Sequence, residues 1–182
     1  MSISATSGNP PLPPADATNM HATVIVLDDR GVLVAGASGS GKSTLALALV
    51  AEWRLAGRFS RLVADDQAFV AARAGRLVAY APLPIAGLAE ARFFGPAAVP
   101  YEPAAVIDLI VELGNEAQPA RVQAGSTRFC AAVEVPLLRL PSRNVIAAGL
   151  AVSAALAGVP FASGDRNSEK LLAEGNDLGL ST

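Results

Sequence analysis

The segment VLVAGASGSGKST (residues 32–44) decides the expected fold of this chain. A short apolar run ends at Gly36, and the residues from Gly36 to Ser43 fit the pattern G-x-x-x-x-G-K-[ST] in full. Glycines in this pattern let successive backbone N–H groups turn inward around an anion, and the positive end of the following helix strengthens the attraction. The strand before the loop and the helix after it are the context that the motif requires, so the sequence predicts a P-loop that binds nucleotide phosphates.

The predicted ATP site comprises the whole loop: Gly36, Ala37, Ser38, Gly39, Ser40, Gly41, Lys42, Ser43 and Thr44. Lys42 is expected to reach the β- and γ-phosphates, and Ser43 is expected to ligate Mg²⁺. Lys42 and Lys170 are the two lysines of the chain, whose other basic residues are arginines. The sequence therefore keeps a flexible point charge where phosphate has to be held.

Upstream of the loop, the sequence predicts a β-hairpin. TVIVL (residues 23–27) is apolar and β-rich, residues 28–31 can form a turn, and residues 32–35 are apolar again. If Leu27 lies opposite Val32, the numbers of paired residues sum to about 59, which places the lone histidine, His21, near Ser38 and the phosphates.

Downstream of the loop, we expect a helix over residues 43–55 and a short strand, RLVA (residues 61–64), that ends in Asp65-Asp66. Ligands of open α/β sheets bind at such strand ends. One carboxylate can hold Mg²⁺ and the other can accept a proton from an attacking hydroxyl, and the sequence does not decide between them. A solvated Asp-Asp turn is the alternative interpretation.

The remaining predicted elements are mostly strands. They are a hairpin at residues 69–72 and 77–79, a buried strand at 105–113, strands at 128–135 and 137–140 interrupted by Pro136, and a helix beginning near Asn144. Together with the P-loop, this order predicts an α/β fold, namely a P-loop-containing mixed sheet with flanking helices.

The composition predicts one well-packed domain. The chain has 182 residues, of which 52% are hydrophobic and 16% are charged, which suffices for a single buried core. We expect a flexible N-terminal arm at residues 1–20, the P-loop domain at 21–163 and a C-terminal tail at 164–182. The single cysteine, Cys130, excludes an intramolecular disulfide and is expected to be a small buried apolar residue.

Charge and hydropathy exclude two classes of partner. The formal net charge of −2 provides no general attraction to nucleic acid or to anionic membranes. The apolar run at residues 145–161 contains Gly149 and Pro160 and is shorter than the ~20 residues that span a bilayer. The N-terminus has neither a basic start nor an apolar stretch, so we expect a cytoplasmic protein with no nucleic-acid or membrane partner.

Taken in order, these pieces resemble the catalytic domain of the HPr kinase/phosphorylase family. The matching residues are His21-Ala22-Thr23-Val24 at the start of a hairpin, the P-loop with Ser38 and Gly39, Val63-Ala64-Asp65-Asp66, Ala81-Pro82, an E-x-R signature at Glu90 and Arg92, and the pair Arg143-Asn144. The order and approximate spacing hold from His21 to about Phe161. The P-loop is specific by itself, and the rest are specific as an ordered set.

The resemblance implies an ATP- and Mg²⁺-dependent kinase that phosphorylates a seryl hydroxyl of the phosphocarrier protein HPr and can reverse the reaction by phosphorolysis. It implies a short-form HPr kinase C-terminal-domain-like fold at residues 21–163 and assembly as a homohexamer. The catalytic residues that it implies are His21, Lys42, Asp66 and Arg121, and the implied magnesium ligands are Ser43 and Glu90. Asp65, Arg92, Arg143 and Asn144 are additional candidates. Asp66 would be the base in the forward direction and the acid in reverse.

Two segments depart from the family pattern. Phe93 replaces a glycine of E-I-R-G-x-G and is followed by Pro96, and Ser142 replaces the glycine of G-R-N. The family associates both segments with the reverse reaction, so the forward reaction is the firmer expectation. The alternatives are a small-metabolite P-loop kinase and a non-catalytic ATP-sensing module that has lost transfer through the altered residues 90–96.

Overall fold

A computed structural model describes residues 11–91, 95–114 and 125–157 of the chain. Over these residues, nine strands form one sheet, two more form a separate hairpin, and two α-helices are present. The strands of the large sheet are β1 (Thr18–Met20), β2 (Ala22–Leu27), β3 (Arg30–Gly36), β4 (Ser60–Ala64), β5 (Ala68–Arg73), β6 (Arg76–Tyr80), β9 (Ala104–Gly114), β10 (Thr127–Cys130) and β11 (Val133–Pro141). The hairpin is β7 (Leu88–Ala91) with β8 (Gly95–Ala98), and the helices are α1 (Lys42–Leu55) and α2 (Val145–Leu156). A short 3-10 turn, Leu83–Ile85, precedes β7.

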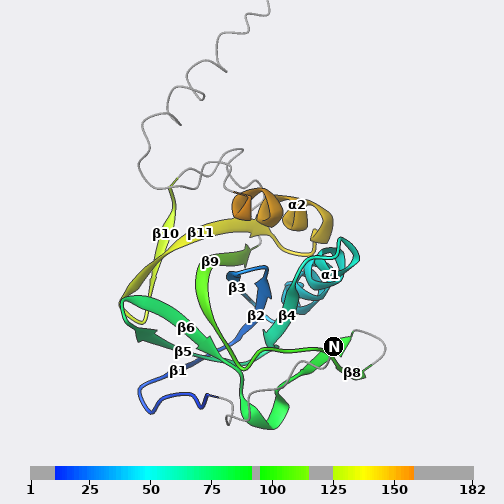
Figure 1. Cartoon of the computed structure of the whole chain (residues 1–182). Helices are drawn as coiled ribbons and strands as arrows, with labels where there is room; N and C mark the ends of the chain where they lie inside the picture. The colour runs from blue at the N-terminus through cyan, green and yellow to red at the C-terminus, as the bar shows by residue number, and fades with distance from the viewer. Residues whose placement is uncertain (1–10, 92–94, 115–124, 158–182) are drawn as a thin grey trace, which may run out of the picture.

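The sheet is mixed and divides at β9. One edge of β9 pairs in parallel with β3. The other edge pairs first with β6, antiparallel, through residues 104–106, and then with β11, parallel, through residues 110–114. The sheet therefore curls away from a flat plane, and Figure 1 shows β11 running beside α2 while β5 and β6 lie away from the helices.

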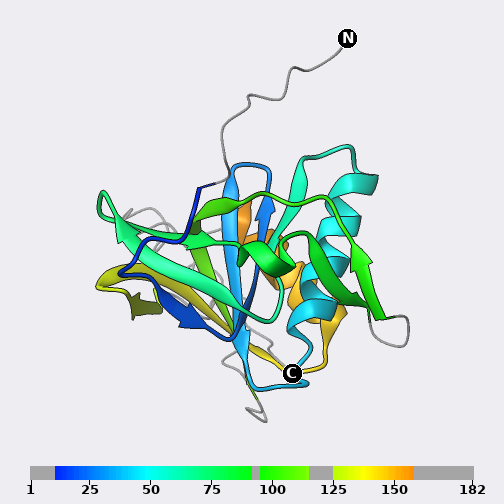
Figure 2. The same ribbon diagram turned by 90° about the horizontal axis from the view of Figure 1, so that it is seen from below.

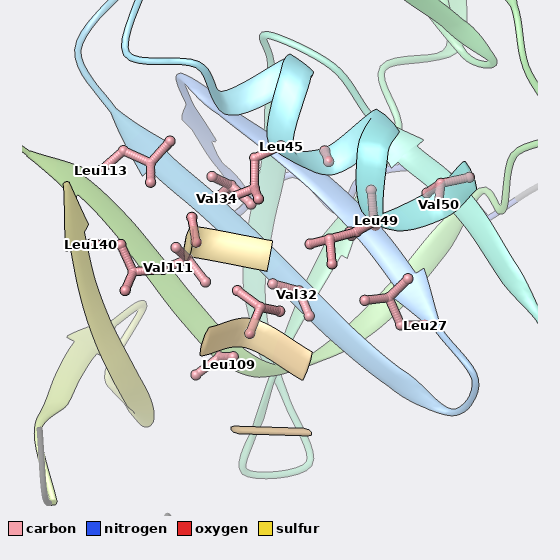
Figure 3. Packing of buried hydrophobic residues seen from close by; sticks show 14 of the residues in the cluster. Leu27, Val32, Val34, Leu45, Leu49, Val50, Leu109, Val111, Leu113 and Leu140 are labelled. Carbon is pink, nitrogen blue, oxygen red and sulfur yellow. The ribbon is translucent and has the colours of Figure 1, made fainter. Parts of the chain in front are cut away.

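Both helices pack on one face of the central strands, and they contact each other (Figures 1 and 2). Apolar side chains of α1 face those of β2, β3 and β9, with Leu140 of β11 beside them (Figure 3). The labelled members of this cluster are Leu27, Val32, Val34, Leu45, Leu49, Val50, Leu109, Val111, Leu113 and Leu140. Burial of this apolar surface supplies the main stabilisation of the layer that carries the loop at residues 36–44.

A second apolar cluster lies within the curl of the sheet. It includes Val24, Leu33, Val63, Val70, Leu77, Ile110 and Leu137, which come from both arms of the sheet. Strands β2, β3 and β9 contribute to both clusters because their side chains alternate between two buried faces. The prediction of a mixed sheet is confirmed, and the flanking helices lie together on one face. Neither α-helix of the described part is long and apolar enough to cross a membrane.

The predicted register of the first hairpin was wrong. Leu27 lies opposite Arg30 rather than Val32, because the turn consists of Asp28 and Asp29 alone. Asp28 has φ 54°, a left-handed conformation that aspartate tolerates better than most residues. The tighter turn moves His21 away from the predicted neighbour Ser38 and toward Lys42.

The N-terminal arm was predicted to extend to residue 20, but its last three residues form β1. This strand pairs with β5 and covers an edge that would otherwise be open. Asp16, just before β1, forms an ion pair with Arg73 of β5, and this hydrogen bond lowers the pKa of the Asp16 carboxyl. The sheet therefore begins before the predicted boundary.

Two further predictions about strands need correction. Pro136 does not interrupt the C-terminal strands but lies inside β11, opposite Thr127, and the chain reverses earlier, at Ala131 and Ala132. The β7–β8 hairpin was not predicted at all, because a four-residue strand containing Glu90 gives little apolar alternation. That hairpin brings Glu90 to the site described next.

Candidate active site

The loop at residues 36–44 connects β3 to α1 at one end of the sheet. Gly41, immediately before α1, has a left-handed backbone with φ 101°, and no side chain caps the helix there. The N-terminus of an α-helix has unpaired N–H groups and a partial positive charge. An uncapped terminus that emerges from a glycine-rich loop suits an anion such as phosphate.

Gly36 is required at the beginning of the loop by close packing. It has φ 151°, and a Cβ atom at this position would lie 2.6 Å from the carbonyl oxygen of Leu113 and 2.8 Å from Oγ of Ser40. Ser40 is 6% exposed, and its hydroxyl has no hydrogen-bond partner among the described residues. An unsatisfied buried hydroxyl in the wall of a loop is a group that a ligand could satisfy.

Lys42, at the first position of α1, is folded into the loop. It is 6% exposed, and Nζ donates to the carbonyl oxygens of Gly36 and Ala37, each at 3.2 Å. Nζ also lies 2.9 Å from Nε2 of His21. The ammonium group is therefore buried and surrounded by acceptors, in a position from which it can turn toward a bound phosphate.

His21 connects Lys42 to Asp66. Its Nδ1 lies 2.9 Å from the carbonyl oxygen of Asp66 and 3.0 Å from Oδ1 of the same residue. Because both of these atoms are acceptors, the network assigns the proton to Nδ1 and leaves Nε2 to accept from Lys42. Asp66 has φ 66°, and its side chain is 70% exposed. This carboxylate is fixed by His21 on one side and open to solvent on the other.

Asp65 has a different environment from its neighbour. It is 8% exposed, and its Oδ1 accepts from the hydroxyls of Ser43, at 2.7 Å, and Thr23, at 2.9 Å. Its Oδ2 accepts from the backbone N–H of Glu90, at 3.1 Å. The sequence left open which of the two carboxylates can hold Mg²⁺, and in the structure Asp65 is the one that contacts Ser43.

The other predicted site residues do not all contact the site. Glu90 reaches Asp65 through its backbone nitrogen, and its side chain is exposed. Thr44 is exposed at the start of α1. Arg92 and Arg121 lie outside the described residues. Among the described residues there is no cluster of three or more histidine, cysteine or acidic side chains that could hold a metal.

Arg143 and Asn144 connect α2 to the loop. The backbone N–H of Arg143 donates to the carbonyl oxygen of Ser40 at 2.9 Å, and Nε donates to that of Gly39 at 3.3 Å. Arg143 has φ 62°, which is unusual for a residue with a side chain. Asn144 caps α2 by accepting from the N–H of Ala147. The loop therefore rests on the residues that begin the second helix.

A cavity of about 480 Å³ opens beside the start of the loop. Its lining residues are Gly36, Ala37, Glu112, Leu113, Gly114, Arg139 and Leu140. Glu112 lies within ion-pair distance of Arg139, at 3.5 Å, and of Arg128, at 3.3 Å. The cavity lies on the β9–β11 side of the loop, whereas His21, Asp65 and Asp66 come from the β2–β4 side.

The donor set fits Mg²⁺ bound together with a nucleotide. Mg²⁺ takes oxygen ligands and is commonly held by one or two carboxylates, a hydroxyl and substrate phosphates, rather than by an all-protein cage. Ser43 and Asp65 provide a hydroxyl and a carboxylate in direct contact at the helix terminus. The uncapped α1, the unsatisfied Ser40 hydroxyl and Lys42 fit the phosphates.

Thr23 is a site residue that the sequence did not single out as functional. It lies within the apolar run TVIVL, where a threonine reads as an ordinary β-former. It lies on β2, two residues after His21, which immediately precedes the strand. Thr23 contacts Asp65 and His21 contacts Asp66, so this two-residue spacing was the available signal.

The chain is similar to a known protein family. The family described as HPr Serine kinase C-terminal domain matches residues 14–144. The chain is 34% identical over 97 residues to the HPr kinase/phosphorylase of Clostridium tetani (strain Massachusetts / E88), a match that covers 52% of the chain and 30% of the relative. The chain thus spans about 30% of the length of that relative.

The fold also matches a solved structure, that of the Hpr(Ser) kinase/phosphatase from Coxiella burnetii. The TM-score is 0.64 at 23% sequence identity, and the match covers 88% of this chain and 94% of that one. At this identity the likeness establishes the fold alone. The loop, Asp65, Asp66 and Glu90 all lie between residues 14 and 144, and over that span the chain belongs to the HPr serine kinase C-terminal domain family.

Proposed function

We propose that the chain is a Mg²⁺-dependent protein kinase that transfers the γ-phosphate of ATP to a seryl hydroxyl of an HPr-like phosphocarrier protein. The observation that carries this proposal is that two adjacent carboxylates have different environments. Asp65 accepts a hydrogen bond from Ser43, whereas Asp66 is exposed and contacts His21. Phosphoryl transfer requires a metal-binding group and a separate group for the acceptor hydroxyl, and these two residues meet both needs. Membership of the family supports the same activity.

Phosphate binding would use the loop and Lys42. The backbone of residues 36–44 and the N-terminus of α1 would hold the β- and γ-phosphates. Lys42 would exchange its contacts with the carbonyl oxygens of Gly36 and Ala37 for contacts with phosphate oxygens. Such a fixed arrangement of donors stabilises the charge that spreads over the transferred group in the transition state.

Ser43 and Asp65 would hold Mg²⁺, with Glu90 as an additional ligand. When bound, the metal would neutralise charge on the phosphate oxygens. Asp65 is 8% exposed, whereas the Asp66 side chain is 70% exposed, so an acceptor hydroxyl can reach Asp66 more readily than Asp65. Its burial and its contact with Ser43 support Asp65 as the proposed metal-binding carboxylate.

Asp66 would act as the base. The seryl oxygen forms a bond to the γ-phosphorus as the bond to the β,γ-bridging oxygen breaks, ADP leaves, and the seryl proton passes to Asp66. His21 holds the Asp66 side chain in place at 3.0 Å. If phosphorolysis also occurs, an oxygen of inorganic phosphate bonds to the phosphoserine phosphorus as the bond to the seryl oxygen breaks. Pyrophosphate is then released, and the protonated Asp66 gives its proton to the seryl oxygen. Arg121, Arg92, Arg143 and Asn144 are proposed to assist in binding phosphate or the partner protein.

The proposal includes assembly as a homohexamer and residence in the cytoplasm, both by resemblance to the family. Light scattering on the purified chain measures its oligomeric state. A monomer at micromolar concentration that transfers phosphate would remove the hexamer from the proposal and leave the kinase reaction intact.

Incubation of the pure chain with γ-labelled ATP, Mg²⁺ and HPr from the same genome tests the activity. We expect label on HPr, and none on an HPr in which the acceptor serine is replaced by alanine. Label that appears only on a sugar or nucleotide in parallel reactions would favour the small-metabolite kinase. Nucleotide binding without transfer to any acceptor would favour the ATP-sensing module. Inorganic phosphate added after labelling measures whether the reaction reverses.

A further inference from the structure

A buried hydroxyl on β2 makes one contact that packing does not require. Thr23 is 0% exposed and is surrounded along β2 by residues such as Ala22 and Val24, which are also 0% exposed. Valine has nearly the shape of threonine and no group that needs a hydrogen bond, so it would suit this position for burial alone. The hydroxyl of Thr23 is instead satisfied by Oδ1 of Asp65, at 2.9 Å.

That contact is one of three that fix the Asp65 carboxylate. Thr23 and Ser43 donate to Oδ1 from β2 and α1, and the N–H of Glu90 donates to Oδ2 from β7. Because the donors come from three separate elements, the carboxylate plane is held against rotation about the side-chain bonds. An ionised carboxylate accepts about four hydrogen bonds, so capacity for a cation remains after these three.

We propose that Thr23 is a positioning residue for the magnesium site, an inference that rests on the proposed function. Mg²⁺ requires near-ideal octahedral geometry, so a rotated ligand weakens its binding more than it would weaken binding of a larger cation. With Thr23 in place, Oδ1 accepts two hydroxyls, and the Ser43 hydroxyl is directed so that its lone pairs remain available for the metal. Groups that orient metal ligands in this way typically change metal affinity by about 10- to 100-fold when they are removed.

Ser60 provides a matched control for the loss of a buried hydroxyl. It is also 0% exposed, and its Oγ donates to the carbonyl oxygen of Val50 at 2.8 Å. It lies at the opposite end of β4 from Asp65. Ser60→Ala therefore removes a hydrogen bond of comparable burial without touching the Asp65 carboxylate.

The experiment measures binding rather than turnover. A fluorescent ADP analogue is titrated against the full chain in EDTA, and Mg²⁺ is then titrated at fixed analogue. For Thr23→Val we expect unchanged binding in EDTA and about a tenfold higher Mg²⁺ concentration at half-saturation. Thr23→Ser, which restores the hydroxyl, and Ser60→Ala should both lie within about twofold of the unaltered chain.

Other results separate this inference from the proposed function. If the unaltered chain binds the analogue with Mg²⁺, and Thr23→Val has the same Mg²⁺ dependence, Thr23 has only a packing role and the inference is overturned. If the unaltered chain binds no analogue under any condition, the proposed function fails and the inference fails with it. Should Thr23→Val not fold, as judged by its thermal transition, Thr23→Ala against Thr23→Ser provides the same contrast.

Discussion

The hydroxyl oxygen of Ser43 lies 2.7 Å from Oδ1 of Asp65, so the first turn of α1 is connected directly to the end of β4. Asp66, the next residue, has its carboxylate on His21 instead. Left-handed backbone at Asp66 turns the chain between the two side chains and places neighbouring carboxylates in different environments.

Exchange of each aspartate for asparagine should therefore have a different effect. Asp66→Asn should leave binding of a Mg²⁺–nucleotide complex intact and lower the rate of transfer by about 10²- to 10⁴-fold, the usual contribution of a positioned acid or base. Asp65→Asn should weaken Mg²⁺-dependent binding. Titration calorimetry and single-turnover transfer from labelled ATP measure the two effects. Normal transfer by Asp66→Asn would show that it is not the base.

Gly36→Ala should damage the loop, because the added Cβ would meet backbone and a buried hydroxyl at less than 3 Å. Overpacking of this kind typically costs about 1–3 kcal/mol of unfolding free energy. We expect a comparable loss of stability in urea melts, with nucleotide binding weakened at least tenfold.

Gly75→Ala is the control for Gly36→Ala. Gly75 also has positive φ, 75°, but nothing lies within 4 Å of the added Cβ. It should therefore show only the cost of strained backbone, about 1 kcal/mol, and normal binding. Equal effects of both substitutions on binding would mean that the close contact at Gly36 is unimportant.

The thiol of Cys130 should react slowly in the folded protein. Cys130 is partly exposed rather than fully buried as predicted, but its partial burial still raises its pKa above the ordinary value of 9.0, so less of the nucleophilic thiolate is present at a given pH. At pH 8, labelling by a disulfide reagent should be several-fold slower in the native chain than in 6 M guanidinium. Equal rates would show that the site is open.

The same pKa shift predicts how stability changes with pH. Because the folded state favours the neutral thiol, this contribution is complete below pH 9.0 and falls as the pH rises through the folded-state pKa. Urea melts of the unaltered chain and of Cys130→Ala between pH 8 and pH 10.5 should reveal the difference. A stability gap that does not change over this range would contradict the prediction.

Leu49→Ala should destabilise the fold through the contact of α1 with the sheet. Leu49 is 1% exposed and lies in the cluster shown in Figure 3, so truncation should cost about 2–5 kcal/mol. Leu55, on the same helix, is 90% exposed, and Leu55→Ala should change stability by less than about 0.5 kcal/mol. Urea melts measure both values. Similar values for the two would contradict the packing described for α1.

The local elements could be predicted because their signals are local. The loop pattern fixes the end of β3 and the start of α1 to within a residue, and the Ala74-Gly75 turn correctly joins β5 to β6. Membership of the family follows from the ordered motifs and is confirmed by the match over residues 14–144.

The contacts that give Asp65 and Asp66 different environments depend on long-range pairing, which a single sequence does not encode in a readable form. The β7–β8 hairpin brings the N–H of Glu90 to Asp65 across 25 residues, and nothing in LAEA indicates it. The register of the β2–β3 hairpin depended on the length of its turn. Asp28 adopts a left-handed backbone, which allows a turn of two residues. The functional role of Thr23 was missed because threonine is common in strands, so its residue type gave no signal.

The shared strand β9 has a consequence for how the chain acquires its fold. It pairs with β3, β6 and β11, and the paired residues of β3 and β9, such as Gly36 and Leu113, are more than 70 positions apart in the chain. During synthesis, the hairpins β2–β3 and β5–β6 can form as they emerge, but the sheet that includes both is completed only when residues 104–114, which pair with β3 and β6, leave the ribosome. Pairing over such sequence distances slows folding. Substitutions in the middle of β9 should therefore lower the yield of folded protein more than equally buried changes in either hairpin.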